Sequence, residues 1–323
     1  MTWKILDKNS SLTNTCYNKN YISFYQGINL ELKDTFFSVF IYQFLIVSLI
    51  YVRIGKGKYW KTIYISSLMG LIGSIIEHST LAYICQLSQL ENKTRVIPFF
   101  IEEIFWVINE YSVPYLNLLK IKTLMEQNMR KYFVIALTLL FIPFAFFRLY
   151  NRYDRMMEGV LNTKISERCH GIAYGTIAIA DMICTFCIIY YVKKKIKNGR
   201  MNASSITNYI MNSSYTILIC VDIVSIFLSS LYIVVNVMEP GSEFSNSPMP
   251  FHCFKSIFIL ILAVDGMIFR NDTSQGSSNK KISLKWILNR KSSKKKEALF
   301  FNPNISNREG FSKNKNNNLS FIG

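Results

Sequence analysis

The stretch Phe36–Lys61, which reads FFSVFIYQFLIVSLIYVRIGKGKYWK, decides the fold. Its first part is apolar and uncharged, and about 18 such residues cross the hydrocarbon core of a bilayer as a helix. Its last part carries Arg53, Lys56, Lys58 and Lys61 without an acidic residue. Basic residues stay on the cytoplasmic side of a membrane. The N-terminus is therefore predicted to lie outside.

Six further apolar stretches follow along the chain. We expect spanning helices at Phe36–Val52, Thr62–Cys85, Ile97–Leu119, Tyr132–Tyr150, Gly171–Val192, Tyr215–Val235 and Phe251–Phe269. This pattern predicts an all-α, seven-transmembrane helix bundle with the N-terminus outside and the C-terminus inside. The net charge of +17 fits that topology, because basic residues gather on the side that faces anionic lipid. The partner that the charge predicts is the lipid bilayer, with no nucleic acid required.

Composition divides the chain into three parts. We expect an extracellular segment over residues 1–35, the bundle over 36–269 and a basic cytoplasmic tail over 270–323. The first part lacks the apolar core of a cleaved signal, so the first span is expected to start membrane insertion. The tail is dominated by Ser, Asn and Lys, and such a composition predicts disorder.

Cysteines at the outer ends of the spans allow a disulfide. Cys16, Cys85, Cys169 and Cys253 are all placed on the outer side, where oxidising conditions permit such bonds. We expect a bridge from Cys85 to Cys169, which would hold the second outer loop to the mouth of the bundle. Spacing alone does not exclude the other pairings.

Ionisable side chains inside the spans carry the functional information. Each costs about 3 kcal/mol at the bilayer centre, so each is expected to face the bundle interior. The members placed in the outer half predict a cavity for an extracellular small-molecule or peptide ligand: Glu77, His78, Glu103, Glu110 and Lys255. The members placed in the inner half predict a switch network: Asn117, Asp222, Asp265 and Phe269.

Helical spacing relates several of these residues. Glu103, Glu110 and Asn117 are seven residues apart, so they follow one face of the third span. Glu102 points about 100° away from Glu103, and the two neighbours are therefore not expected to face the same spot. A purely structural explanation is that Lys255 pairs with a glutamate to neutralise buried charge.

Two kinds of chemistry are disfavoured. Lys255 lies too close to the outer end of its span for the mid-membrane lysine that binds retinal in rhodopsins. His78, His170 and His252 lack the H-x-x-x-H or H-E-x-x-H spacing of a zinc hydrolase. We therefore expect no enzyme, no catalytic residues, no metal and no cofactor, and an intramembrane zinc hydrolase ranks last among the alternatives.

The layout of spans, loops and termini resembles the G-protein-coupled receptor superfamily over about 235 residues. Residues 265–269, DGMIF, are similar to the (N/D)-P-x-x-(Y/F) signature of rhodopsin-like receptors, without its proline. By this resemblance Asp265 and Phe269 would move on activation, and a G protein would be the cytoplasmic partner. The D-R-Y and C-W-x-P motifs of that family are absent.

These observations predict a receptor-like, multi-pass protein of the plasma membrane, with an internal membrane as the alternative location. It would bind an extracellular ligand in the outer cavity and signal to the cytoplasm. The main alternative is a transporter or proton-coupled carrier, in which the same carboxylates relay ions. Internal repeats would favour transport, and the sequence shows none.

Overall fold

The computed structural model describes residues 7–267 except Leu12, Lys56, Lys93, 123–124, 126, 198–204 and 238–246. The predicted tail over 270–323, and Phe269 of the predicted switch network, lie outside the described residues. The described chain is helical, with an isolated β-bridge between Tyr21 and Gln86. The all-α prediction is confirmed.

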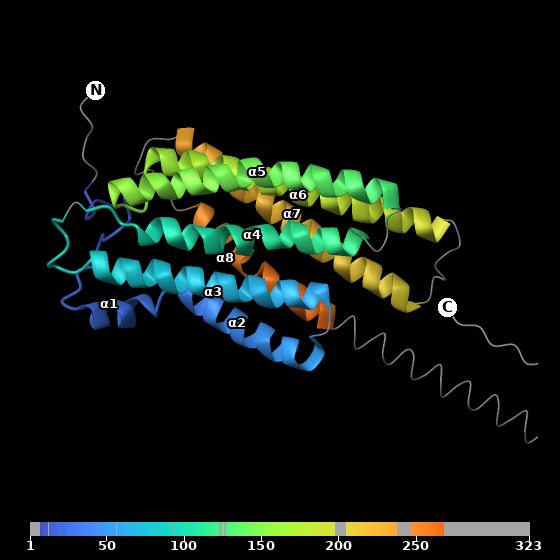
Figure 1. Cartoon of the computed structure of the whole chain (residues 1–323), viewed down its shortest axis with the longest axis horizontal. Helices are drawn as coiled ribbons and strands as arrows, with labels where there is room; N and C mark the ends of the chain where they lie inside the picture. The colour runs from blue at the N-terminus through green and yellow to red at the C-terminus, as the bar shows by residue number, and fades with distance from the viewer. Residues whose placement is uncertain are drawn as a thin grey trace, which may run out of the picture. The chain divides into compact units, whose positions relative to one another are not determined.

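Eight helices are labelled in Figure 1. They are α1 (Phe24–Glu31), α2 (Thr35–Ile54), α3 (Lys58–Ile84), α4 (Pro98–Lys122), α5 (Gln127–Glu158), α6 (Lys164–Lys197), α7 (Ser205–Val237) and α8 (Pro248–Ser256). After a single turn residue the chain is helical again to residue 267, so Pro248–Met267 forms the last apolar helical stretch. Each predicted span coincides with one of α2–α7 or with this last stretch.

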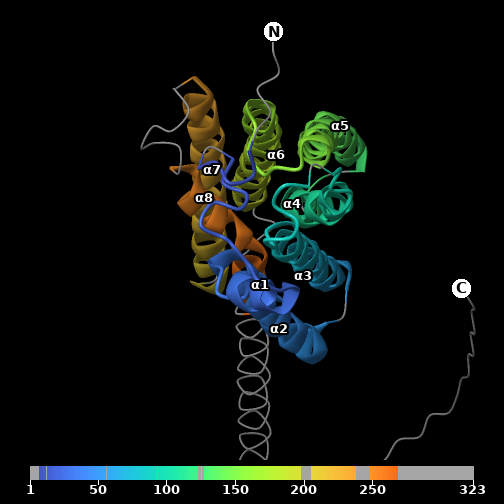
Figure 2. The same ribbon diagram turned by 90° about the vertical axis from the view of Figure 1, so that its left-hand side faces the viewer.

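The helices form one bundle. From α2 to α7, each helix packs against the next along the chain, and α4 also contacts α6. α8 contacts both α7 and α2, which closes the bundle, as the view along the helices in Figure 2 shows. The side chains between the helices are therefore shielded from the surroundings.

Five helical stretches within the described residues are long and apolar enough to span a membrane: Thr35–Ile54, Lys58–Ile84, Met129–Glu158, Lys164–Tyr191 and Pro248–Met267. α4 contains three glutamates, and the apolar part of α7 is the shorter stretch Ile219–Val235. A membrane protein is thus supported, while the count of seven spans and the orientation of the termini stay predictions.

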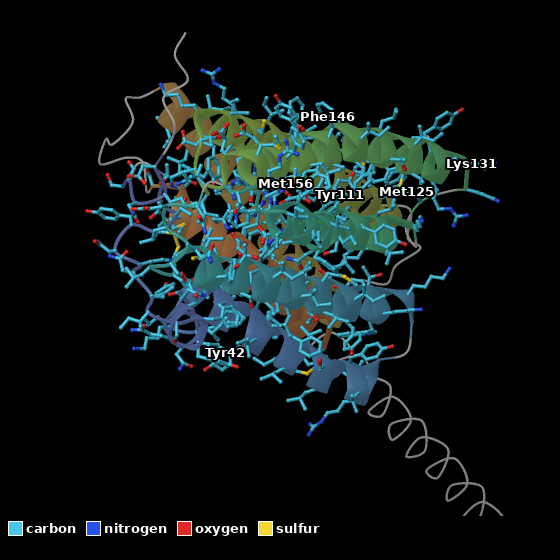
Figure 3. All side chains as sticks on the ribbon, turned by 60° about the vertical axis from the view of Figure 1, so that its left-hand side comes forward. Tyr42, Tyr111, Met125, Lys131, Phe146 and Met156 are labelled. Carbon is cyan, nitrogen blue, oxygen red and sulfur yellow. A yellow bond between two sulfur atoms is a disulfide. The ribbon has the colours of Figure 1, made fainter. Side chains whose placement is uncertain are left out.

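The outer faces of the helices are apolar. Tyr42 on α2 and Phe146 on α5 are 64% and 61% exposed and lie on the outside of the bundle in Figure 3. Many other large apolar side chains are exposed along the same helices, including Leu49 and Leu139. Soluble monomers rarely expose apolar surface of this extent, whereas lipid tails cover it without cost.

The N-terminal segment is folded against one end of the bundle, which we call the capped end. There Cys16 is bonded to Cys85 at the end of α3, with their Cα atoms 5.2 Å apart. Tyr21 pairs with Gln86 beside this bond, and Lys8 Nζ donates to the carbonyl of Asn92 at 2.7 Å. These contacts hold the described part of the N-terminal segment against the end of α3 and the loop that follows it.

The predicted bridge from Cys85 to Cys169 is wrong in this structure. Cys169 is a buried free cysteine on α6, and Cys85 already has its partner. The prediction failed because it treated the N-terminal segment as a loose extension. The bridge between Tyr21 and Gln86 instead brings Cys16 close to Cys85, which directly precedes Gln86.

A buried carboxylate ties α1 to α3 at the capped end. Glu31 accepts hydrogen bonds from Lys19 Nζ at 2.8 Å and from the Tyr21 hydroxyl at 2.6 Å, and it lies 2.7 Å from Nδ1 of His78. Burial by itself raises the pKa of Glu31, but the bonds with His78, Lys19 and Tyr21 outweigh it and lower the pKa to about 2. Glu31 is therefore held as a carboxylate.

Candidate functional site: a buried ion network and the adjoining pocket

α5 brings three arginines into the bundle interior. It continues to Glu158 rather than ending near Tyr150, so Arg148, Arg152 and Arg155 belong to a helix and not to an outer loop. Their spacings of four and three residues place them on one helical face. All three are buried, and Arg148 is only 1% exposed.

Two of these arginines, Arg148 and Arg152, bind glutamates of α3 and α4. Arg148 forms ion pairs with Glu103 and, at 3.2 Å, with Glu110. Arg152 Nε donates to Glu103 at 2.6 Å, while its Nη1 contacts Glu102 and lies 3.7 Å from Glu77. Buried charges are stable only when paired and hydrogen-bonded, so this cluster neutralises most of its own charge.

The expectation that Glu102 and Glu103 face different spots is wrong. The two carboxylates reach the same guanidinium, that of Arg152, through different nitrogen atoms. The angle between the two side chains on α4 is compensated by the width of the guanidinium, which donates from several directions in one plane. The prediction considered α4 by itself. Arg152 on α5 is wide enough to bind both carboxylates despite the angle between them.

His170 joins α6 to the same arginines. Its Nδ1 lies 3.1 Å from Arg148 Nη1, and its Nε2 lies 2.9 Å from both Arg155 Nη2 and Asn151 Nδ2. Arg155 Nε also donates to the Ser166 hydroxyl at 2.9 Å. The contacts fix the position of α6 relative to α5 near the capped end.

Tyr174 connects the ion network to the last helical stretch. Its hydroxyl oxygen lies 2.6 Å from Nε2 of His252 and 3.2 Å from both Glu110 Oε1 and Arg148 Nη1. Lys255 Nζ lies 4.5 Å above the centre of the same ring. Glu110 and Lys255, which come from α4 and α8, thus meet around one tyrosine of α6.

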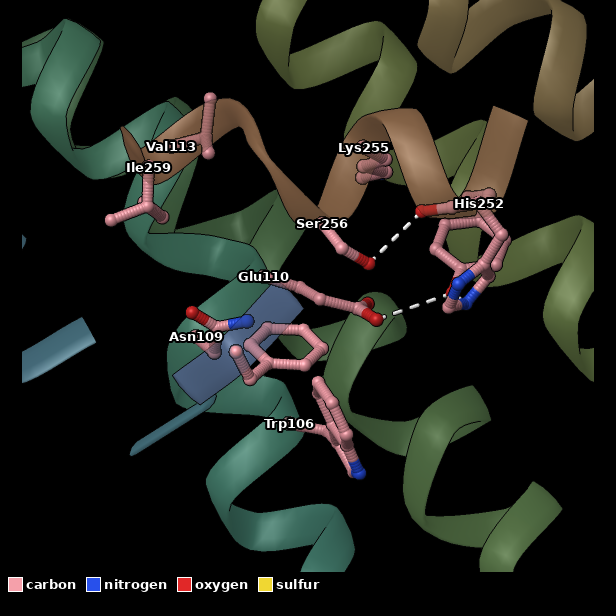
Figure 4. Close-up of a pocket in the computed structure, with 10 residues that line it drawn as sticks. Trp106, Asn109, Glu110, Val113, His252, Lys255, Ser256 and Ile259 are labelled. Atoms are coloured by element: carbon pink, nitrogen blue, oxygen red, sulfur yellow. Dashed lines mark hydrogen bonds between the residues drawn. The ribbon is translucent and has the colours of Figure 1, made fainter. Parts of the chain in front are cut away.

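A pocket adjoins this tyrosine. It is lined by Phe40, Trp106, Asn109, Glu110, Val113, Tyr174, His252, Lys255, Ser256 and Ile259. Figure 4 shows Glu110, His252 and Lys255 around it, with Trp106 and Asn109 on the α4 side. The cavity has a volume of about 20 Å³, which is room for about one water molecule.

Several polar atoms of the pocket-lining residues are buried without a hydrogen-bond partner. Among the described residues that line it, these are Lys255 Nζ, His252 Nδ1, Trp106 Nε1 and Glu110 Oε2. A buried unsatisfied polar group costs about 1–3 kcal/mol, so such a concentration in one place calls for a bound partner. The pocket combines these atoms with the aromatic rings of Phe40 and Tyr174.

The predicted ligand residues divide into three groups. Glu110 and Lys255 line the pocket. Glu103 and Glu77 lie in the ion network, where arginines bind them. His78 pairs with Glu31 and stacks on a ring of α2 instead, so the structure does not place it at the pocket. The sequence therefore predicted two residues of the pocket and two of the network behind it.

The predicted switch residues are spread over three helices. Asn117 on α4 and Asp222 on α7 are buried, and Asp265 lies 3.8 Å from Lys120 Nζ. Phe269 is not among the described residues. That these positions act as one network stays a prediction.

Sequence reasoning missed five further members of the network, which are three arginines, a histidine and a tyrosine: Arg148, Arg152, Arg155, His170 and Tyr174. The four-then-three spacing of the arginines was a signal, because it continues a helical face beyond the apolar run. The position of His170 in the sequence gave no such signal, since its partners Arg148, Asn151 and Arg155 lie on another helix. In the described part of the chain, no group of three or more His, Cys, Asp or Glu side chains is arranged to hold a metal.

No known protein family matches this chain, and neither does a curated protein or a solved structure. The geometry of the site is therefore what supports a function.

Proposed function

We propose that this chain is a seven-helix membrane receptor that binds a small extracellular ligand in the pocket between α4, α6 and the last helical stretch. The observation that carries the proposal is the meeting of Glu110 and Lys255 around Tyr174, with unsatisfied polar atoms on both sides. Packing alone does not require opposite charges on separate helices to line one pocket.

The ion network narrows the chemistry of the ligand. Arginines already neutralise Glu77, Glu102 and Glu103, so these carboxylates anchor the helices rather than bind the ligand. Lys255 and His252 are the basic residues among those that line the pocket, and aromatic rings form its walls. We infer a small ligand with an anionic group and a flat apolar part, because such a molecule satisfies the ammonium and packs on the rings.

The pocket also suggests how binding would be transmitted. It is too small for such a ligand without a shift of its walls, so binding favours a different arrangement of the helices. The helical pattern is interrupted at Ile257, directly after Lys255 and Ser256. The last helical stretch would pivot there, and its far end approaches the membrane face where a G protein would dock.

A ligand screen on matched variants tests this function. Surface-expressed protein is exposed to a library of small aromatic carboxylates, and nucleotide exchange on co-expressed G proteins is measured. Loss of a hydrogen bond to a charged group costs about 1.5–3 kcal/mol. Lys255→Met should therefore raise the ligand concentration for a half-maximal response about 10- to 100-fold. Lys164→Met, which changes an exposed lysine of α6, is the control. An unaltered response of Lys255→Met at normal surface level would rule out this site.

A proton-coupled carrier is the second candidate. The observation that favours it is a succession of ionisable side chains from the ion network inward, in which Lys255 feels the charge of both Glu110 and Asp181. Such a succession can pass protons between the two sides of a membrane. Reconstituted vesicles decide between the functions, because a carrier acidifies their interior along with the uptake of solute and a receptor does not.

A further inference from the structure

A second polar cluster lies between α6 and α7, and none of its four residues lines the pocket. Asp181 is 1% exposed and Asp222 is 9% exposed, and the hydroxyl groups of Thr185 and Ser225 are buried with them. α6 and α7 pack along each other in Figures 1 and 2. Two carboxylates and two hydroxyls therefore come together in the interior of an apolar bundle.

The four side chains face each other across the two helices. Ser225 of α7 lies beside the carboxylate of Asp181, and Thr185 of α6 lies beside that of Asp222. No hydrogen bond of ordinary geometry is made by either carboxylate oxygen of Asp181, by Oδ1 of Asp222 or by the two hydroxyl groups. Five buried oxygen atoms that lie close together without a well-formed hydrogen bond point to a bound species.

The charge balance of the bundle interior also indicates a bound cation near Asp181 and Asp222. Apart from the Asp265–Lys120 pair, its acidic residues within the described chain are Glu77, Glu102, Glu103, Glu110, Asp181 and Asp222. Its basic residues in the same range are Arg148, Arg152, Arg155 and Lys255. The arginines lie with the glutamates, and Lys255 is shared between Glu110 and Asp181. The missing positive charge therefore belongs to the two aspartates, since uncompensated charge is costly in a low-dielectric interior.

We propose that a sodium ion binds between Asp181, Asp222, Thr185 and Ser225, with the remaining negative charge neutralised by a proton. Carboxylate and hydroxyl oxygens are ligands for hard cations, and the set contains no nitrogen or sulfur donor. The neighbouring charge of Lys255 opposes a divalent ion. This inference does not depend on the ligand or the signalling proposed above.

Protons compete with sodium at these carboxylates. The ionisable groups whose charges act on Asp181 or respond to it come from each packed element: Lys255 from α8, Tyr111 from α4, Cys184 from α6 and Asp222 from α7. The sodium-bound site already holds one proton, and a second proton on the remaining carboxylate removes the negative charge that binds the ion. Stabilisation by sodium should therefore decrease as the pH falls.

Thermal unfolding of the full-length protein in detergent micelles tests the site. Sodium chloride replaces N-methyl-D-glucamine chloride up to about 150 mM at constant ionic strength, so that screening is unchanged. An ion that binds only the folded protein raises its Tm progressively with concentration. We expect Asp181→Asn and Asp222→Asn to abolish this rise and Ser225→Ala to reduce it.

Ser229→Ala is the matched control, because this hydroxyl lies one turn further along α7 and is bonded to the carbonyl of Gly171 at 3.2 Å. It should keep the full sodium-dependent rise. Equal Tm values of the wild-type protein in both salts at neutral and alkaline pH would overturn the proposal, because protons alone would then neutralise the aspartates. A rise that survives in Asp181→Asn would overturn it too. The wild-type comparison remains decisive if an aspartate variant fails to fold.

Discussion

Replacing Arg152 by methionine tests the buried ion network most directly. Methionine retains an apolar stem but removes the guanidinium, which donates to Glu103 at 2.6 Å, contacts Glu102 and lies 3.7 Å from Glu77. Two buried carboxylates, those of Glu102 and Glu103, and the half-buried carboxylate of Glu77 would lose a shared partner. Removing one side of a buried ion pair costs about 3–5 kcal/mol, because the remaining charge stays buried. For a bundle of this size that corresponds to a decrease of about 10 °C in Tm.

The assay is thermal unfolding in detergent micelles, followed by near-ultraviolet circular dichroism. Arg95→Met, at an exposed position before α4, controls for the loss of a positive charge. Adding Glu102→Gln and Glu103→Gln to the Arg152 variant should restore part of the lost stability, since those changes remove the unpaired charge. If Arg152→Met unfolds at the same temperature as Arg95→Met, this guanidinium is not buried among the carboxylates, and the account of the network fails.

Two further predictions concern the capped end. The pKa of Glu31 is about 2 in the folded protein against its ordinary 4.5, so its stabilising effect is complete above about pH 4.5 and is lost as the pH falls towards 2. Glu31→Gln should therefore flatten the decrease of Tm in that pH range, and an unchanged slope would contradict the assignment. Cys16→Ser opens a loop with a sequence separation of 69 residues, at a cost of about 4 kcal/mol in chain entropy, whereas Cys169→Ser should leave that bond intact. Peptide mapping without reduction checks the Cys16–Cys85 disulfide, and recovery of a disulfide-linked Cys85–Cys169 peptide would refute this pairing.

The positions of the helices were largely predictable from the chain, but α5, α6 and α7 extend beyond the predicted spans. The run Phe36–Val52 became α2 (Thr35–Ile54), because the length of an apolar run is a local property and lipid leaves the backbone no alternative to a helix. The prediction missed the end of α5, where polar residues from Asn151 onward were taken for a loop. They are helical because their charges find partners inside the bundle.

The candidate site was predictable only in part. Glu110 and Lys255 could be selected from the cost of burying charge, and the structure does bring them to one pocket. The role of Tyr174 in connecting them could not be predicted, because nothing in the spacing along α6 shows which side chain faces α4 and α8.

The sequence by itself determined that this chain is helical and apolar on its outer faces, since both follow from residues close together in the chain. The tertiary structure decided which charges meet. Arg152 and Glu103 are 49 residues apart, and Cys16 and Cys85 are 69 apart. Contacts over such separations depend on the position and rotation of one helix against another, and the packing of the whole bundle sets these together.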